Sequence, residues 1–480
     1  MSVDVGFRSE RGPLLVALIV ATALGAINGP ILATAVPTII SELGGFTSFP
    51  WLFTIFLLTQ AATIPVFGRL SDAVGRKPIM MVGILLTLVG ALLCSLATSI
   101  EALIVFRAIQ GVGAGAVHPM AITIAGDIYT LRERAKVQSY IATVWAIASA
   151  AGSVVGGIFA QAGFWRGAFL INIPMCLLAG WLILRHFRDF TGGRRRQRFD
   201  VWGAVLLVSS VSLLLLAILE GGRSWEWLSV TSIVLVGLGA AFGAAFVLVE
   251  LRVSEPLLPM GILRRRTMVT TTAVSAGIGA ILLGLTSYVP VYLEKVLHLQ
   301  PVWSGVVLGA FIVGWPVGAA LSGRAYLRFG FRATCILGAA VSILGSAALT
   351  AFATLPSVAL VVTTCTVIGL GIGLMGPASM VAAQSSAIWG ERGVVSALYM
   401  FARSIGSAFG VAVFGAMVTL RISSDDIDVV PLEDVTGALV LVFTGVLVVS
   451  VASLIASLAM ERRGTASQAR GEDLPPVVLS

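Results

Sequence analysis

The sequence predicts an all-α polytopic membrane protein with about fourteen transmembrane helices. Of its 480 residues, 58% are hydrophobic and only 11% are charged, and the mean hydropathy is +1.00. Charge clusters divide the chain into apolar segments of roughly 20 residues, the length at which an α-helix crosses a hydrocarbon layer of about 30 Å. The segments are hydrophobic on all sides, whereas strands of a membrane β-barrel would alternate in polarity.

Fourteen segments meet this criterion, and each is expected to form one span. They are residues 13–36, 51–70, 79–98, 102–124, 136–160, 167–185, 201–219, 228–249, 268–289, 303–323, 333–353, 357–378, 394–418 and 436–460. The first follows Arg8 and Arg11 and looks like a secretion signal. It is longer than a signal core and leads into further spans, so we expect an uncleaved helix.

The basic residues predict the orientation in the membrane. Of the 31 Lys and Arg residues, 25 lie in the loops and tails on one side, 4 lie on the other side, and two lie inside spans. Cytoplasmic loops carry the excess of basic residues. We therefore expect a multi-pass protein of the cell membrane, the inner membrane where a cell has two, with both termini in the cytoplasm.

An internal repeat predicts two halves. The run at residues 323–332, after the tenth span, repeats the glycine and arginine positions of the run at 68–78, after the second span. Removing the seventh and eighth spans leaves six helices on each side, as in transporters built from two parallel repeats around a midplane cavity. We expect two six-helix bundles related by a pseudo-two-fold axis, with two extra central helices. The predicted divisions are an N-terminal tail at 1–12, the first bundle at 13–190, the extra helices at 191–266, the second bundle at 267–460 and a tail at 461–480.

The polar run at residues 68–78 is predicted to be a gating loop. Its glycines permit sharp turns, and Asp72 lies close in sequence to cations of opposite charge. Such a loop can latch one bundle to the other and lock an outward-open state. The expected gating residues are Gly68, Asp72, Gly75, Arg76 and Lys77.

Two arginines lie inside predicted spans. An arginine in hydrocarbon is costly and normally faces a cavity or a partner, so Arg107, with Gln110 beside it, is a functional candidate. The alternative for Arg107 is a hydrogen-bonded arginine that only holds helices together. Arg403 lies about ten residues, or roughly 15 Å, into its span and has no acidic residue on its own helix, so a charge that faces the cavity is favoured over a structural counter-ion.

Five motifs in order resemble the major facilitator superfamily, in its fourteen-span drug:proton antiporter branch. They are the run Gly68–Pro78, Arg107-Ala108-Ile109-Gln110-Gly111-Val112-Gly113, Gly152-Ser153-Val154-Val155-Gly156-Gly157, Phe169-Leu170-Ile171-Asn172-Ile173-Pro174 and Phe401-Ala402-Arg403-Ser404-Ile405-Gly406. The resemblance covers most of the chain except the tails.

The resemblance implies roles for two of these motifs. It implies that Arg107 assists a proton relay, and that Gly152, Gly156 and Gly157 form a bend and a seal that favour antiport. Small residues at this spacing also allow plain helix packing. Ser153 stands where proline is usual in the family and keeps its backbone N–H, which weakens the expected bend.

The first span departs from the family pattern at the residue that usually titrates. Asn28 stands in place of an aspartate, and asparagine cannot carry a proton, although it can hydrogen-bond a substrate. Proton coupling would then need another intramembrane group. His118 has a suitable side chain, since an unperturbed imidazole titrates near pH 6.5. The alternative is a neutral histidine hydrogen-bonded inside the bundle.

Two further groups complete the expected site. Asp127 is expected to form an inner gate with Arg132 or with the gating loop. Aromatic side chains are expected in a greasy substrate cavity. Those residues are Trp145, Tyr288, Tyr292 and Trp315.

The predicted function is export of hydrophobic or amphipathic small molecules, of multidrug type, by proton antiport and alternating access. The expected partners are the substrate, protons and membrane lipids, acting on a monomer without cofactor or metal. Nucleic acid is not expected despite a pI near 9.8, because the basic loops adjoin anionic headgroups. The alternative is an exporter of lipids or other endogenous amphiphiles with weak proton coupling. Catalysis is not expected, because the three histidines begin no ligand or triad motif.

Overall fold

The computed structural model of the chain describes 16 helices. Its described residues are 9, 11–44, 48, 51–188, 200–222, 225–253, 258, 260–299, 301–353, 355, 357–387, 391–419, 421 and 431–461. The helices of the first half are α1 Gly12–Leu43, α2 Trp51–Val74, α3 Arg76–Ser95, α4 Ile100–Ile128, α5 Leu131–Gln161, α6 Gly167–Leu170 and α7 Asn172–His186. Those that follow are α8 Val201–Glu220, α9 Val230–Glu250, α10 Met260–Leu263, α11 Arg266–Lys295, α12 Pro301–Phe329, α13 Phe331–Ala351, α14 Val358–Ser385, α15 Arg392–Thr419 and α16 Leu432–Ala459.

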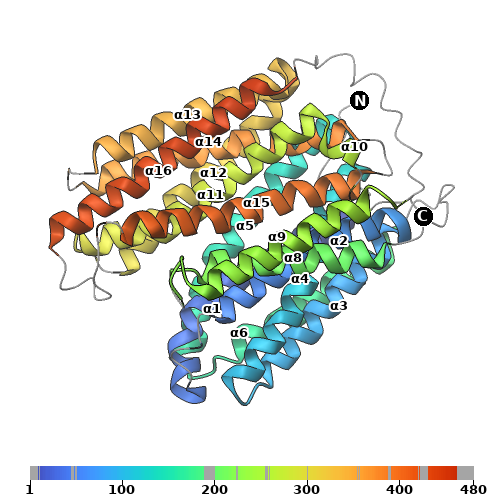
Figure 1. Ribbon diagram of the computed structural model, residues 1–480, viewed down its shortest axis with the longest axis horizontal. Helices are drawn as coiled ribbons and strands as arrows, with labels where there is room; N and C mark the ends of the chain where they lie inside the picture. Colours follow the sequence, from blue (N-terminus) through green and yellow to red (C-terminus); the bar gives the residue numbers. More distant parts are fainter. Residues whose placement is uncertain are drawn as a thin grey trace.

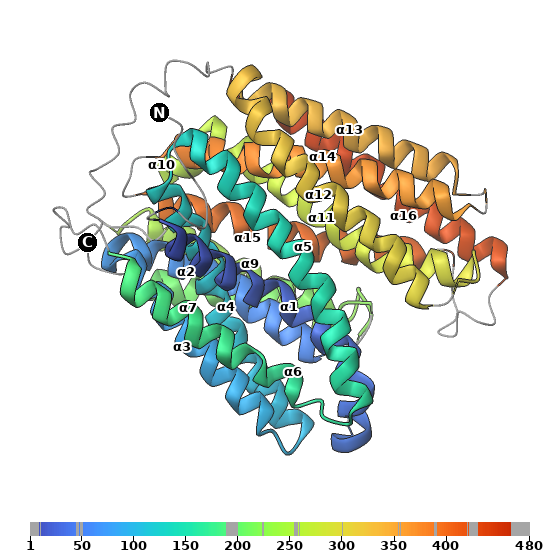
Figure 2. The ribbon, with the colours of Figure 1, turned by 180° about the vertical axis from the view of Figure 1, so that it is seen from behind.

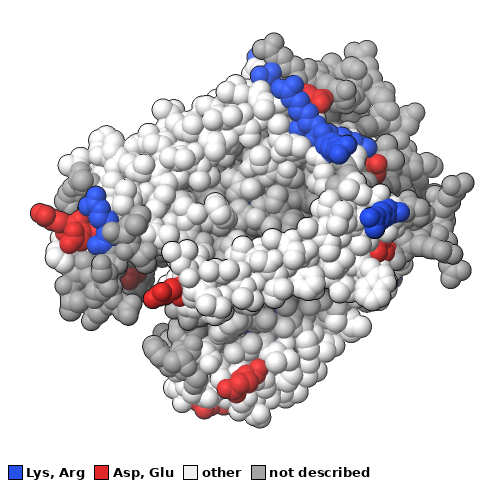
Figure 3. Space-filling view, viewed as in Figure 1, with Lys and Arg blue, Asp and Glu red and all other residues white. Residues whose placement is uncertain are grey.

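The all-α membrane fold predicted from the hydropathy pattern is confirmed. Thirteen of the described helices are long and apolar enough to cross a membrane. The remaining expected span, residues 303–323, lies within α12, a helix of 29 residues. Large apolar side chains are exposed around the bundles, for example Leu238 and Ile455. In the view of Figure 3 the outer surface is almost free of charge and the charged side chains lie toward its ends, as a surface in contact with lipid requires.

The helices form two bundles that meet along a seam. Figures 1 and 2 show α1 to α7 on one side and α11 to α16 on the other, converging near α10 and diverging toward the opposite end. The bundles touch where α5 packs on α12 and where α2 and α4 pack on α15. The extra helices α8 and α9 pack on each other, and α8 contacts both α2 and α15. The extra pair therefore covers the seam between the bundles.

Each bundle has its own apolar core, and a third cluster joins them. Leu18 and Met120 belong to the core of the first bundle, while Ile278 and Phe443 belong to that of the second. A further cluster combines Ile64 of α2 with side chains of α8, α14 and α15. Since apolar burial offers little driving force between helices in lipid, close packing must hold these contacts together.

Proline positions match between the halves. The second helix of each half contains a proline, Pro65 in α2 and Pro316 in α12. The fourth helix does so too, with Pro119 in α4 and Pro377 in α14. Proline removes a helical hydrogen bond and permits a bend. The repeat seen in the loops therefore extends into the spans.

Gly156 and Gly157 of α5 make a matched pair for testing this packing. A Cβ on Gly156 would lie 2.5 Å from the Ile31 carbonyl oxygen of α1, whereas a Cβ on Gly157 would meet nothing within 4 Å. We expect Gly156→Ala to destabilise the protein by about 1–3 kcal/mol, because α1 and α5 must separate. Gly157→Ala should be neutral or slightly stabilising.

The measurement is the apparent melting temperature of each variant in the same detergent, followed by size exclusion after heating. Equal melting temperatures for the two variants would show that α5 does not pack on α1 through Gly156.

Candidate functional site

A cavity lies between the two bundles, on the seam. It encloses about 260 Å³ and is lined by α1, α2, α4 and α5 from one side and by α11, α12, α14 and α15 from the other. Its volume is just below the ~300–1,000 Å³ typical of small-molecule sites. Because both halves contribute, any motion of one bundle against the other changes the shape of the cavity.

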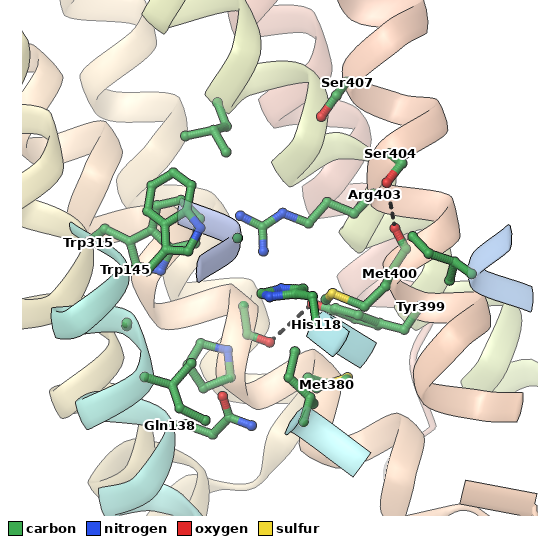
Figure 4. A pocket seen from close by; sticks show the side chains of 18 of the residues that line it. His118, Gln138, Trp145, Trp315, Met380, Tyr399, Met400, Arg403, Ser404 and Ser407 are labelled. Carbon is green, nitrogen blue, oxygen red and sulfur yellow. Dashed lines mark hydrogen bonds between the residues drawn. The ribbon is translucent and has the colours of Figure 1, made fainter. Parts of the chain in front are cut away.

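Arg403 of α15 points into this cavity, toward an aromatic pair (Figure 4). Its guanidinium carbon lies 4.7 Å from the centroid of the Trp315 ring, and the Trp145 and Trp315 ring centroids are 5.3 Å apart. A guanidinium over an indole face is a favourable cation–π arrangement. Among the described residues Arg403 has neither an ion-pair partner nor a side-chain hydrogen bond, so its edge donors face open space.

His118 of α4 lines the cavity below Arg403 (Figure 4). Gly25 of α1 leaves room beside the ring, since a Cβ there would lie 3.7 Å from His118 Nδ1. Within the described part of the chain, the imidazole makes no hydrogen bond. No described residue therefore holds His118 as a hydrogen-bonded structural histidine, and the ring is available to a ligand or a proton.

Arg107 lies away from the cavity, inside the first bundle. It is 1% exposed and donates to the Leu52 carbonyl oxygen at 3.1 Å and to Gln110 Oε1 at 2.7 Å. Gln110 Nε2 donates to Asn28 Oδ1 at 3.1 Å, and Asn28 donates to the Leu24 carbonyl oxygen at 2.6 Å. The guanidinium also lies 4.2 Å from the centroid of the Phe56 ring. The structure therefore joins three of the expected relay residues in one buried string without a carboxylate.

The gate cluster, defined as Asp72, Arg76, Asp127 and Arg392, lies where α2 meets α15. Arg76 pairs with Asp72 at 2.6 Å and with Asp127 at 3.1 Å, and these three residues are at most 8% exposed. Arg392 lies 3.7 Å from Asp127 Oδ1. Buried charges are tolerable here because each has an opposite partner.

Asp72 carries the link between the bundles. The backbone N–H groups of Gly393 and Val394 donate to its two carboxylate oxygens at 3.1 and 2.8 Å. These donors belong to the first turn of α15, where N–H groups lack helical acceptors and the helix dipole favours an anion. The acidic side chain of one half thereby caps a helix of the other half.

The prediction that the run at residues 68–78 forms a loop is wrong, because Gly68 lies within α2, α3 begins at Arg76, and Gly75 alone separates the two helices. Two glycines of this run have direct structural roles. A Cβ on Gly68 would meet the Ala397 side chain and lie 3.0 Å from the Gly393 carbonyl oxygen, so only glycine lets α2 approach α15 this closely. Gly75 precedes α3 with a φ of 129°, which side-chain-bearing residues rarely adopt. Lys77 points elsewhere and donates to the Leu184 carbonyl oxygen of α7, within its own half.

A second contact closes the same end between α4 and the other half. Gln384 of α14 donates to the Ile122 carbonyl oxygen at 3.4 Å and to Ser396 Oγ at 3.0 Å. Arg392 donates to the Gly126 carbonyl oxygen at 3.2 Å. Of the two partners expected for Asp127, the run at residues 68–78 is contacted through Arg76. The side chain of the other, Arg132, lies outside the described residues.

Two of the four expected cavity aromatics lie elsewhere. Trp145 and Trp315 line the cavity, whereas Tyr288 and Tyr292 do not. Tyr292 is 1% exposed and donates to the Ala353 carbonyl oxygen at 2.8 Å. The phenol of Tyr288 packs edge-on against Phe414 at 6.4 Å. Tyr292 belongs to the core of the second bundle, and Tyr288 packs against that core.

Sequence reasoning missed several residues of the site. Arg392 and Gln384 are two of them, and their partners Asp127, Gly126 and Ile122 all lie on α4 of the other half, far away in sequence. Gln60, Gln138 and Tyr399 also line the cavity. A polar residue in the middle of an apolar span is the signal that could have identified the two glutamines and the tyrosine, but it does not show which way a side chain points.

The chain matches known transporters along most of its length. Residues 17–411 match the Major Facilitator Superfamily. The chain is 30% identical over 424 residues to the multidrug transporter protein MdtP of Bacillus subtilis (strain 168), covering 87% of this chain and 77% of that protein. It is 28% identical over 408 residues to multidrug resistance protein 3 of the same organism, covering 85% of this chain and 79% of that protein.

Two solved structures share the architecture. The human organic anion transporter MFSD10 (TETRAN) aligns with a TM-score of 0.65 at 13% identity, covering 92% of this chain and 99% of that one. A bacterial homologue of the iron transporter ferroportin, in an outward-facing state, aligns with a TM-score of 0.63 at 12% identity, covering 93% and 99%. At these identities the likeness shows the fold alone.

The gate cluster can be tested with a cysteine reporter in the cavity. All four native cysteines are buried, so Ser404→Cys, which lies in the cavity lining, provides one accessible thiol. We expect Asp72→Asn to raise at least tenfold the rate at which a membrane-impermeant maleimide reaches this thiol from the gate side. Losing a hydrogen bond to a charged acceptor costs ~1.5–3 kcal/mol, which weakens the closed gate accordingly.

Glu391→Gln is the matched control for this experiment. Glu391 lies beside the gate and pairs with Arg265 at 2.8 Å, but both side chains are partly exposed, and the pair joins the starts of α11 and α15 without contacting the first bundle. A partly exposed pair contributes ~0–1 kcal/mol, so labelling should stay at the wild-type rate. An unchanged rate in Asp72→Asn would mean that the carboxylate does not hold the gate shut.

Proposed function

The chain belongs to the Major Facilitator Superfamily, and from this we propose that it exports hydrophobic or amphipathic small molecules by alternating access. The observation that carries the proposal is the cavity between the halves, combined with the gate that closes one end of the seam. Asp72 of the first half holds Gly393 and Val394 of the second, so separating the bundles at this end requires breaking that contact. Access to the cavity can therefore switch from one end to the other.

The multidrug transporters similar to this chain support an efflux role, and the lining of the cavity fits an amphipathic substrate. Trp145, Trp315, Met380 and Met400 provide apolar surface, and methionine adapts easily to different shapes. Polar side chains such as Gln60, Gln138 and Ser404 lie among them. Such a lining suits substrates defined by size and polarity more than by a fixed set of hydrogen bonds.

We place the gate end on the cytoplasmic side of the membrane. Among the described residues, Arg76, Arg265 and Arg392 lie at this end, as the positive-inside pattern requires. The helix ends fit this placement, because α1 starts and α16 finishes at the end where the gate lies (Figure 1). On this placement the cavity is closed toward the cytoplasm, and the proposed bundles are residues 13–190 and 267–460 with the extra helices at 191–266.

We propose that His118 carries the exchanged proton. It is the cavity-lining residue whose side chain ordinarily titrates closest to neutral pH. Asn28, in the buried string, cannot titrate, and the described lining contains no carboxylate. A proton on His118 adds positive charge below Arg403, which changes the charge that a substrate meets. Loading and unloading His118 from opposite sides would couple the proton gradient to export.

The proposal is tested with purified protein in liposomes. An imposed pH gradient should drive flux of a fluorescent amphiphile, and an ionophore that collapses the gradient should stop it. His118→Ala should lose at least tenfold of the gradient-driven flux while counterflow without a gradient persists, because only the coupling group is removed. His298→Asn is the control, since His298 is exposed and lies outside the cavity.

Flux that ignores the ionophore would overturn proton coupling, and full gradient-driven flux in His118→Ala would overturn the relay. Absence of any flux of hydrophobic or amphipathic compounds, with or without a gradient, would overturn the exporter itself.

Asn28 favours a second candidate function, export of lipids or other endogenous amphiphiles with weak proton coupling. Its amide already accepts from Gln110 and donates to Leu24, so no titratable group stands at this point of the string. We expect Asn28→Asp to increase the pH dependence of flux, because a carboxylate joined through Gln110 to Arg107 can exchange a proton. Lipid copurifying with the wild type, identified by mass spectrometry, together with flux insensitive to pH, would favour this second function.

A further inference from the structure

We infer that the cavity selects amphipathic organic anions, with Arg403 binding the anionic group and Trp145 and Trp315 holding an aromatic or apolar body. The inference rests on the proposed transport function and narrows its substrate class. The charge of the cavity, the geometry of its arginine and the character of its walls each support it.

Positive charge in the cavity lacks a counter-charge from the protein. Arg403 is the one fully charged side chain in the described lining, and no Asp or Glu of the described chain lines the cavity. The other polar lining residues include Gln60, Gln138 and Ser404, which are uncharged. A cation within a membrane bundle is costly and is normally neutralised by a partner. A cationic substrate would add a second unpaired positive charge, whereas an anionic substrate would supply the missing negative charge.

Two other buried arginines, Arg76 and Arg107, differ from Arg403 because they have acceptors within the protein. Arg76 has two carboxylates, Asp72 and Asp127. Arg107 has a carbonyl and an amide oxygen as acceptors. Each of these arginines is satisfied within the protein and is 1% exposed. Arg403 is half-buried, faces the cavity and lies over the Trp315 ring, and no described residue accepts a hydrogen bond from its guanidinium. Its N–H donors can therefore reach a ligand.

The contact with Trp315 prepares the guanidinium for an oxyanion. The aromatic face at 4.7 Å covers one side of the group and leaves its edge N–H donors directed into the cavity (Figure 4). Those donors form a fork that matches carboxylate, sulfonate or phosphate oxygens in a bidentate arrangement. Because the contact with Trp315 restricts the side chain beforehand, little conformational entropy is lost when the anion binds.

The walls next to Arg403 suit the remainder of such a substrate. Trp145 extends the aromatic surface beyond Trp315, and Met380 and Met400 lie on the far side of the same space. An aromatic or aliphatic body can occupy this volume while its charged end contacts the guanidinium. The site thus predicts one charge sign combined with loose specificity for the body.

The test compares three probes that share a naphthalene body. Naphthylacetate is an anion, naphthylacetamide is its neutral isostere, and naphthylethylammonium is a cation of similar size. Binding to the purified full-length protein in neutral-lipid nanodiscs is measured by isothermal titration calorimetry without any gradient. We expect the anion to bind at least tenfold more tightly than the amide, and the cation more weakly than the amide.

Three variants assign the preference to its residue. Arg403→Gln should abolish the advantage of the anion over the amide and leave the affinity for the amide within about twofold. Arg403→Lys should keep part of the advantage, since it retains the charge but loses the fork. Arg421→Gln, which removes an exposed arginine just beyond α15, should behave as wild type.

The inference is overturned if wild type binds the cation or the amide as tightly as the anion, or if correctly folded Arg403→Gln keeps the anion preference. The charge series on the wild type decides the first point even if Arg403→Gln does not fold. Because binding is measured at equilibrium, its outcome is separate from the proposed export. Anion binding with no flux would overturn the proposed export but support the anion site. Equal flux of all three probes would support export but overturn the anion site.

Discussion

The buried carboxylate of Asp72 is the contact that joins the two bundles at one end of the seam. It belongs to the first bundle, yet the strongest donors it meets outside its own bundle are the N–H groups that begin α15 of the second. A low dielectric makes this contact strong and makes its loss costly. Gly68 and Gly393 are required at the same place because any side chain would hold the two helices apart. The Asp72 carboxylate that caps α15 and the two glycines together hold the bundles in contact at this end of the seam.

Three arginines inside the bundles differ in the partners of their guanidinium groups. Arg76 is neutralised by carboxylates and serves the gate. Arg107 is satisfied by uncharged oxygens and a phenylalanine face, which makes it a fixed positive charge inside the first bundle. Arg403 faces the cavity without an acceptor from the described chain. Since charges in lipid are tolerated only when compensated, we propose that the uncompensated one contacts the substrate.

Much of the fold could be predicted from the sequence, but only part of the site. Apolar segment length locates the spans, and the charged run at residues 68–78 contains Asp72, which contacts the first turn of α15. Orientation of side chains is harder, because membrane helices are hydrophobic all round and carry little amphipathic signal. Trp315 and Tyr292 are both aromatic residues near apolar spans, yet Trp315 lines the cavity and Tyr292 is buried in the core of the second bundle. The partners of Asp72 were invisible because they are backbone groups 321 and 322 residues away.

The substrate charge inferred from Arg403 also bears on the absence of an acid at position 28. An exporter of cations works against an inside-negative membrane potential, and a carboxylate in its cavity can hold either the cation or a proton. An anion leaving the cell instead moves with that potential, which favours its export by ~2.3 kcal/mol per charge per 100 mV. Proton exchange at His118 would then add to a driving force already present. On this view three features have one explanation: Asn28 at the position of the acid, the uncharged buried string to Arg107, and a described cavity lining that contains no carboxylate. An exporter of anions needs the fixed positive charge of Arg403 in its cavity and does not need a carboxylate there.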